Sequence, residues 1–249
     1  MYSHIVMVLM IAVFVYQTEG LGVQSIKCDL QRLGALTCRG ELQHDRQEGL
    51  RLASLLEEEE VMLGQLEGTW DLAYTSSPFL FMSSPFFMAA RAVCRTPEEA
   101  DRFAWFCRKH RDALAFTSIG NVTQIITKGE LVSEFESNVA AIPGLPVLIK
   151  GTIESRARVE VDKGDQTMTL LMDTVRIKQG TSNLPFVGGK GGLLDNFDGL
   201  KTSELSDMIG SIFPKYRRPS PQFRTYFLDD TMRISRNQDD DVFVYTRRD

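Results

Sequence analysis

Histidine is scarce in this sequence, which limits the chemistry the chain can perform. Only His4, His44 and His110 occur among 249 residues. His4 lies in a segment that we expect to be removed, so general acid–base catalysis built on histidine is poorly supplied. Nucleophilic catalysis lacks support as well, because there is no Gly-x-Ser-x-Gly elbow and the other two histidines lie in unrelated helical contexts. We therefore predict no catalytic residues and no enzymatic activity.

Metal-ligand spacing is also missing. Cys28, Cys38, Cys94 and Cys107 form no Cys-x-x-Cys pair, and only Cys107-x-x-His110 resembles ligand spacing. A structural zinc site needs four well-spaced ligands. The acidic runs at 229–230 and 239–241 lack the spacing of a calcium-binding EF-hand loop and are typical of turns. We expect no metal and no cofactor. The cysteines can be buried thiols or, in an oxidising compartment, disulfides.

Positive charge is deficient. The formal net charge is −5, whereas contact with nucleic-acid phosphates needs clustered Lys and Arg, so no nucleic-acid partner is expected. The sequence VGGKGG at 187–192 does not match a nucleotide-binding P-loop, because Gly191 follows Lys190 where Ser or Thr is required. A connector or lid is the better interpretation of this segment.

Long apolar runs are absent apart from one near the N-terminus. Residues 5–16, IVMVLMIAVFVY, are too few for a membrane-spanning helix, which needs about 20. The run is typical of the apolar part of a signal peptide, and Thr18 and Gly20 are small residues suited to cleavage before Leu21. We predict a signal peptide over 1–20. A retained membrane anchor and a buried helix are the alternatives.

What the sequence does contain is a helical segment followed by many strands. Residues 25–64 carry leucines at helical spacing, and from residue 66 to 249 two-residue alternation dominates. The strand at 68–77 places Trp70, Leu72 and Tyr74 on one face. A second helical region begins at Thr96-Pro97-Glu98-Glu99, which has the pattern of a capping box.

The alternation continues almost to the end of the chain. A hairpin is predicted at Lys128-Gly129, and the strand 152–161 alternates apolar and charged residues. A long connection over 179–221 precedes two last strands, 226–237 and 241–248, joined by a hairpin at 237–241. In the first of them Met232 and Ile234 share one face, and Arg233 and Ser235 share the other face, which we expect to be wet. Antiparallel strands without a βαβ rhythm predict a barrel or a sandwich.

An aromatic-rich stretch follows the first predicted strand. It contains Phe79, Phe81, Phe86 and Phe87 together with two methionines. These side chains can form core or cap the barrel. They can also line an entrance for a lipid or isoprenoid tail, or contact a lipid surface.

Four segments together resemble the plastid lipid-associated proteins, also called plastid fibrillins. They are LTCRGELQHDRQEGLRLASLLEE (36–58), LEGTWDLAYTSSP (66–78), SIGNVTQIITKGELVSEFESNV (118–139) and TYFLDDTMRISRNQDDDVFVYTRR (225–248). The last is the most specific, because lipocalins share the Gly-x-Trp element of the second. The resemblance runs from about residue 25 to 249, and the family domain is expected over 21–249.

The resemblance implies a non-catalytic, lipocalin-like barrel at plastoglobules or thylakoids of the plastid (chloroplast), with lipids, carotenoids or prenylquinones as ligands. Trp70 would lie at the barrel base under Arg233 or Arg236, through a cation–π contact. Gly68, Trp70, Asp229, Arg233 and Arg236 would be structural signature residues. Trp70, Tyr74 and the four phenylalanines are candidate ligand contacts.

Alternatives stay open for the compartment that the protein reaches and for its function. An apolar signal stands where plant members carry a Ser-rich transit peptide, which fits a plastid reached through the ER; the alternative is the secretory pathway. The leading hypothesis is a lipid- or isoprenoid-binding structural or carrier protein. The alternatives are a scaffold for an isoprenoid-quinone enzyme or photosynthetic complex, with a protein partner, and, least favoured, an enzyme acting on a bound lipid.

Overall fold

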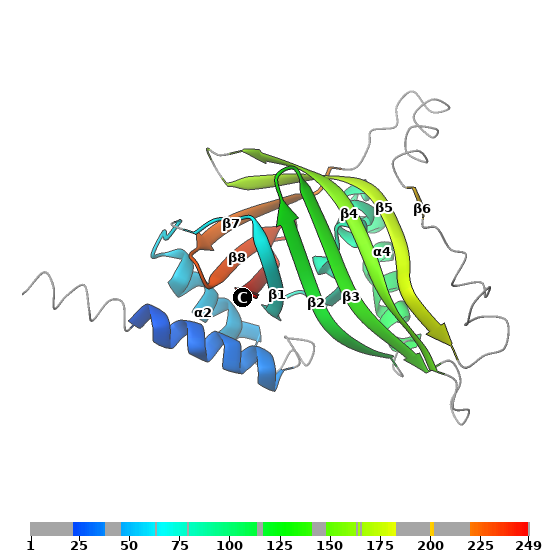
Figure 1. The fold of residues 1–249 in the computed structure, drawn as a ribbon, viewed down its shortest axis with the longest axis horizontal. Helices are drawn as coiled ribbons and strands as arrows, with labels where there is room; N and C mark the ends of the chain where they lie inside the picture. The colour runs from blue at the N-terminus through cyan, green and yellow to red at the C-terminus, as the bar shows by residue number, and fades with distance from the viewer. Residues whose placement is uncertain are drawn as a thin grey trace, which may run out of the picture.

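The mainly β architecture predicted from the sequence is present. The computed structural model describes residues 22–37, 46–62, 64–78, 80–113, 117–140, 148–162, 164, 166–182, 200–201 and 220–248. Its strands form an antiparallel barrel, with helices before the first strand and a helical insertion after it (Figure 1). The fold-class prediction is therefore confirmed.

The elements follow the chain in this order. Residues 22–36 form the first helix. The other helices are α2 (Arg46–Glu57), the 3₁₀ helix η1 (Leu80–Ser83), α3 (Pro85–Val93) and α4 (Pro97–Ala113). The strands are β1 (Gly68–Thr75), β2 (Thr117–Thr127), β3 (Glu130–Ala140), β4 (Leu148–Asp162), β5 (Thr167–Ser182), β6 (Leu200–Lys201), β7 (Gln222–Leu228), β8 (Met232–Asn237) and β9 (Val242–Arg247).

Eight of the described strands close into a ring. Their order is β1, β2, β3, β4, β5, β7, β8 and β9, and β9 pairs again with β1. The contact that completes the ring is short, because β5 pairs with β7 only through Thr167, Met168 and Thr169. Farther along β5, Thr174 and Val175 pair with β6 instead. Ring closure leaves no free edge along most of the sheet, which protects it from pairing with other chains.

Local sequence signals explain several boundaries. Gly129 occupies the β2–β3 turn at φ +84°, a conformation that glycine adopts without strain. At the start of α4, the Thr96 hydroxyl accepts from the Glu99 backbone N–H (3.3 Å), and the Glu99 carboxylate accepts from the Thr96 N–H (3.3 Å). This is the capping box predicted from the sequence.

The barrel wall separates two hydrophobic cores. The inner core is built on strand residues together with side chains from η1, α3 and α4, including Met82, Met88, Ala89 and Cys107. The outer core lies between the two N-terminal helices and the strands β1, β7, β8 and β9. In Figure 1 these helices lie beside β7 and β8, and α4 lies behind β4 and β5. Most of the barrel wall between β9 and β7 is therefore covered on both sides.

The prediction that Trp70, Leu72 and Tyr74 share one face is wrong. The β1–β9 register shifts between Leu72 and Tyr74. Trp70 and Leu72 belong to the inner core, whereas Tyr74 belongs to the outer core. An extra residue in a strand reverses the direction of every side chain that follows it.

The last segments also differ from the expectation. Three strands occur there, because Asp229 makes a turn between β7 and β8, where its carboxylate accepts from the backbone N–H groups of Thr231 and Met232 (2.8 Å each). The hairpin at 237–241 is present, with the Asn237 side chain accepting from the N–H groups of Asp239 and Asp241 (3.0 and 2.9 Å).

Two boundaries shift, and one side chain differs in burial. The helical region expected over 25–64 contains the helices at 22–36 and Arg46–Glu57. The connection expected over 179–221 begins later, because β5 continues to Ser182, and β6 lies within it. Val161, expected on the apolar face of its strand, is 43% exposed.

Some predictions fall outside the described residues: the signal peptide at 1–20, Cys38, Phe79 and the segment 187–192. Cys28, Cys94 and Cys107 are free thiols. Across the described portion of the chain, the helices are too short or too polar to traverse a bilayer.

Candidate functional site

Trp70 at the start of β1 lies between two arginine side chains. The Arg233 guanidinium lies 5.3 Å from the centroid of its ring, and that of Arg247 lies 4.3 Å from it. The Trp70 indole N–H donates to the Leu66 carbonyl (2.9 Å), and Arg247 donates to the Glu67 carbonyl (3.0 Å). The contact expected between Trp70 and Arg233 is thus present, whereas Arg236, the alternative, lies elsewhere.

Arg233 is fully buried inside the barrel. Its guanidinium lies 4.2 Å from the Tyr245 ring centroid and donates to the Gln124 side-chain oxygen. Gln124 in turn donates to the Ser83 carbonyl (3.0 Å), which connects the wall to the helical insertion. Burial lowers the pKa of Arg233 to about 10, so the group still carries its charge at neutral pH.

A row of polar side chains crosses the inner face next to this arginine. Trp70 pairs with Gln124 across β1 and β2, Gln124 with Ser133 on β3, and Ser133 with Ser155 on β4. The Ser155 hydroxyl bonds that of Ser84 at the start of α3 (3.0 Å). Hydroxyl and amide groups therefore form one layer within an otherwise apolar interior.

Four polar groups at this layer have no hydrogen-bond partner among the described residues. The Arg233 side chain contributes Nε and Nη1, Tyr245 its hydroxyl, and Ser133 its hydroxyl. Burial raises the pKa of Tyr245, so this hydroxyl keeps its proton and can donate.

A pocket of about 270 Å³ opens between the helical insertion and the β8–β9 hairpin. We call it the mouth; its lining residues are Arg46, Ser77, Pro78, Met82, Arg91, Ala100, Phe103, Ala104, Asp239 and Asp241. Ion pairs cross its rim, Arg91 with Asp239 (2.7 Å) and Arg46 with Asp241 (3.5 Å). Met82 also belongs to the inner core, so the apolar wall of the mouth continues into the barrel.

The structure describes the side chains of only some of the aromatic residues predicted to contact a ligand. Phe87 is half-buried against the inner core. Phe81 lies in η1 and Phe86 in α3, but their side chains are outside the description, as is Phe79 altogether. Tyr74 lies in the outer core, where its hydroxyl contacts the Arg46 carbonyl (3.5 Å), so it faces away from the barrel interior.

Three predicted signature residues occupy structural positions. Gly68 has φ +143°, and a Cβ there would lie 2.5 Å from Arg247 Nη1. Asp229 binds Lys27 of the first helix; burial opposes its ionisation, but the hydrogen bonds from Lys27 and from two backbone N–H groups lower its pKa. Arg236 forms a bidentate pair with Glu57 of α2.

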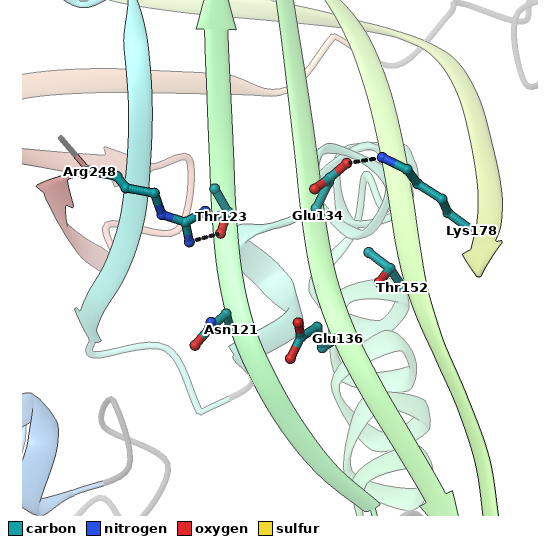
Figure 2. A pocket seen from close by; sticks show the side chains of 7 residues that line it. All are labelled: Asn121, Thr123, Glu134, Glu136, Thr152, Lys178 and Arg248. Carbon is teal, nitrogen blue, oxygen red and sulfur yellow. Dashed lines mark hydrogen bonds and ion pairs between the residues drawn. The ribbon is translucent and has the colours of Figure 1, made fainter. Parts of the chain in front are cut away.

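The outer face of β2 to β5 has a different chemistry. A depression of about 210 Å³ lies on this face. Figure 2 shows the side chains that line it, which are Asn121, Thr123, Glu134, Glu136, Thr152, Lys178 and Arg248. Lys178 pairs with Glu134 (2.9 Å), and Arg248 pairs with Asp71 (2.8 Å). Opposite charges are matched on this polar face, so it suits water better than hydrocarbon.

Glu154 is the centre of the charge network on that face. It is 1% exposed and accepts from Arg176 (2.6 Å) and Arg156 (2.8 Å). Burial alone would raise its pKa, but the two arginine hydrogen bonds lower it to about 2. In the described part of the chain, no three His, Cys, Asp or Glu side chains are grouped to hold a metal ion.

The family model PAP_fibrillin matches residues 52–246. The chain belongs to the PAP_fibrillin family. Membership indicates a lipid-associated structural protein of plastids, from a family that is generally not enzymatic. No curated protein and no solved structure matches the chain.

Sequence reasoning missed three members of the inner polar layer, Gln124, Ser133 and Tyr245. It also missed Arg247, which contacts the Trp70 ring. Gln124 and Ser133 stand on the same face as the apolar residues Val122, Ile126 and Leu131, so two-residue alternation carried the signal. A polar residue at an apolar position of the alternation is a signal that the sequence alone provides. Their gathering around Arg233 depends on ring closure, which the sequence did not specify.

Proposed function

We propose that this protein is a non-catalytic carrier or structural protein that holds a lipid or isoprenoid molecule inside its barrel. Carotenoids and prenylquinones are the ligand classes that the family resemblance implies, and plastoglobule or thylakoid surfaces are the corresponding sites. The observation that carries the proposal is the mouth, because its apolar wall passes through Met82 into the inner core.

The inner core contains flexible side chains that a ligand can displace. Met82, Met88, Met168 and Met172 all belong to it. Methionine has an unbranched, flexible side chain that adapts to different neighbours. Burying a hydrocarbon tail there is favourable by about 25 cal/mol per Å² removed from water. A ligand that displaces these side chains replaces one apolar contact with another.

Two variants of α4 test the route through the mouth. Ala104→Trp places an indole in the mouth lining, whereas Arg102→Trp places the same group on the exposed side of α4. Organic extracts of protein from the native source should contain stoichiometric pigment, quinone or lipid. Recombinant protein with Ala104→Trp should take that molecule up more slowly, and Arg102→Trp should not. If no preparation of the protein contains a bound pigment, quinone or lipid, the carrier proposal is wrong.

A scaffold role is the second candidate, and one observation favours it. Trp105 on α4 is 57% exposed and Val93 at the end of α3 is 50% exposed. Exposed aromatic and apolar residues are frequent at protein interfaces. Co-purification of empty protein with one defined partner, lost with Trp105→Ala, would support this role over that of a carrier.

The route to the plastid is also a proposal. Family membership indicates plastid association. We propose that residues 1–20 direct the chain through the ER first. A fluorescent fusion carrying residues 1–20 should enter the ER, and deletion of these residues should leave the fusion in the cytosol.

A further inference from the structure

Arg233 differs from the other buried charges of the described chain. Lys27 pairs with Asp229, Arg236 with Glu57, and Glu154 with two arginines. Arg233 is as deeply buried as any of them, yet no ion pair among the described residues joins it to a carboxylate, and its electrostatic neighbours are Tyr245 and Arg247. A buried charge without a countercharge is strongly unfavourable unless another group supplies one.

The groups that surround Arg233 offset its charge only in part. The Trp70 and Tyr245 rings present their negative faces to it. Ring faces attract the cation but do not accept the in-plane hydrogen bonds that Nε and Nη1 offer. The Gln124 oxygen accepts one bond, from Nη2. Two guanidinium nitrogens, Nε and Nη1, therefore have no acceptor among the described residues.

Two hydroxyls that have no partner among the described residues belong to the same polar layer as this arginine. Arg233 and Tyr245 are directly paired across β8 and β9, and Ser133 is paired with Gln124, which contacts Arg233. Tyr245 and Ser133 each offer one O–H donor. The structure thus gathers one positive charge and several hydrogen-bond donors around one place in the barrel.

We propose that this place binds the carboxylate head group of a single-chain lipid, with Arg233, Tyr245 and Ser133 as the donors. This inference rests on the proposed function and narrows its ligand class. A carotene hydrocarbon has no acceptor, and a quinone carbonyl accepts hydrogen bonds but leaves the cation uncompensated. A carboxylate brings one negative charge and about four acceptor positions.

The tail has a defined direction. The polar layer contacts η1 and α3 through Ser83 and Ser84. Met82 directly precedes Ser83, and the Met88 N–H donates to the Ser84 carbonyl (3.1 Å); both methionines belong to the inner core. From Met82 the apolar wall continues to the mouth. The tail takes the place of these methionine side chains and runs from Arg233 toward the mouth.

The test uses the full chain with Trp105→Phe, because the sequence contains two tryptophans and this change leaves Trp70 as the reporter beside Arg233. The probes are oleate, methyl oleate and a short prenylquinone, titrated while Trp70 emission is recorded and repeated by calorimetry. Oleate should bind at least tenfold more tightly than methyl oleate, which has the same tail without the charge.

Single-donor variants separate a head-group site from a general apolar site. Tyr245→Phe and Ser133→Ala should each weaken oleate binding about tenfold and methyl oleate binding by a smaller factor, because an ester carbonyl accepts a weaker hydrogen bond than a carboxylate. Arg233→Met should abolish the preference for oleate. The control is Thr225→Val with Ser235→Ala, which removes two inner hydroxyls that already bond each other (3.1 Å); oleate binding should not change.

The outcomes distinguish this inference from the proposed function. Equal affinity for oleate and methyl oleate, or oleate binding unaffected by both single-donor changes, would overturn the head-group site. If the prenylquinone binds and oleate does not, the carrier function stands and the carboxylate site is wrong. If none of the three probes binds, the proposed function fails together with the site.

Discussion

The guanidinium of Arg247 lies 4.3 Å from the centroid of the Trp70 ring, at the base of the barrel. Because Arg233 also contacts this ring, at 5.3 Å, one indole joins the first strand to the last two. The contact brings together segments more than 150 residues apart in the sequence, so it contributes to ring closure as well as to local packing.

The first prediction concerns the energetic coupling of this contact. Trp70→Ala and Arg233→Ala should each destabilise the protein, and their combined effect on the free energy of unfolding should be smaller than the sum by about 1 kcal/mol or more. Urea unfolding of the two single variants and the double variant measures the difference. Trp70→Ala combined with Arg158→Ala, on an exposed site of β4, should be additive within about 0.5 kcal/mol. Additive effects for Trp70 and Arg233 would show that the ring and the cation stabilise the fold independently.

The second prediction concerns the attachment of α2 to the barrel. Arg236 donates to Glu57 through Nε (2.9 Å) and Nη2 (2.8 Å), and both side chains are largely buried. Glu57→Gln should destabilise the protein by about 1–3 kcal/mol, because a partly buried guanidinium loses its bidentate acceptor. Hydrogen exchange should speed up in α2 more than in β2 or β3.

A second ion pair on the same helix provides the control. Glu48 and Arg51 are also hydrogen-bonded, at 2.6 and 2.7 Å, but both are about half exposed. Exposed pairs contribute little to stability because water and salt screen them, so Glu48→Gln should leave the free energy of unfolding nearly unchanged. Equal effects of the two changes would contradict a special role for Glu57.

The alternation of residue types predicted much of this fold, for a local reason. In β2, β3 and β4 one face is apolar and the other polar, so the sequence pattern and the burial pattern coincide. The α4 capping box depends on residues three apart and was equally readable. Such signals need no knowledge of distant segments.

The errors occurred where distant segments decide the structure. Arg233 and Ser235 were read as one side of a polar, wet strand, yet both are fully buried. Alternation identifies residues that share a face, but the two helices that cover the other face of β8 come from residues 22–57. Tyr74 changed sides through an irregularity in pairing with β9. Neither event has a local sequence signal.

The third prediction is a pH dependence that originates at Glu154. Its pKa is about 2 in the folded protein against an ordinary value of 4.5. Because the folded value is the lower one, the carboxylate stabilises the fold fully above pH 4.5, and this contribution is lost as the pH falls toward 2. The loss should be on the order of 2–3 kcal/mol.

Urea unfolding between pH 6 and 3, compared with Glu154→Gln, measures the Glu154 contribution. The variant should be less stable at pH 6, and the difference should shrink at pH 3. Glu160→Gln, an exposed change on the same strand, should follow the wild-type curve. If the difference in free energy of unfolding between wild type and Glu154→Gln stays constant across this range, the substitution acts through packing and not through the loss of negative charge.

The fourth prediction concerns the contact between α2 and β1 at Gly49. A Cβ at this position would lie 2.1 Å from the Tyr74 hydroxyl and 2.2 Å from the ring carbon that bears it. Helix propensity alone favours Ala over Gly by about 1 kcal/mol. The clash is larger, because a rigid buried ring must move, so Gly49→Ala should destabilise the protein by about 1–3 kcal/mol.

Removal of the Tyr74 ring should reverse the sign of the effect that Gly49→Ala has on stability. In a Tyr74→Ala background the space next to Gly49 is open, and Gly49→Ala should then stabilise the protein by up to about 1 kcal/mol relative to Tyr74→Ala alone. Thermal and urea unfolding of the four proteins complete the cycle. The reversal is specific to a Tyr74 side chain that lies under α2. If Tyr74 pointed into the barrel together with Trp70 and Leu72, Gly49→Ala would stabilise the protein in both backgrounds, and that result would refute the shift in register within β1.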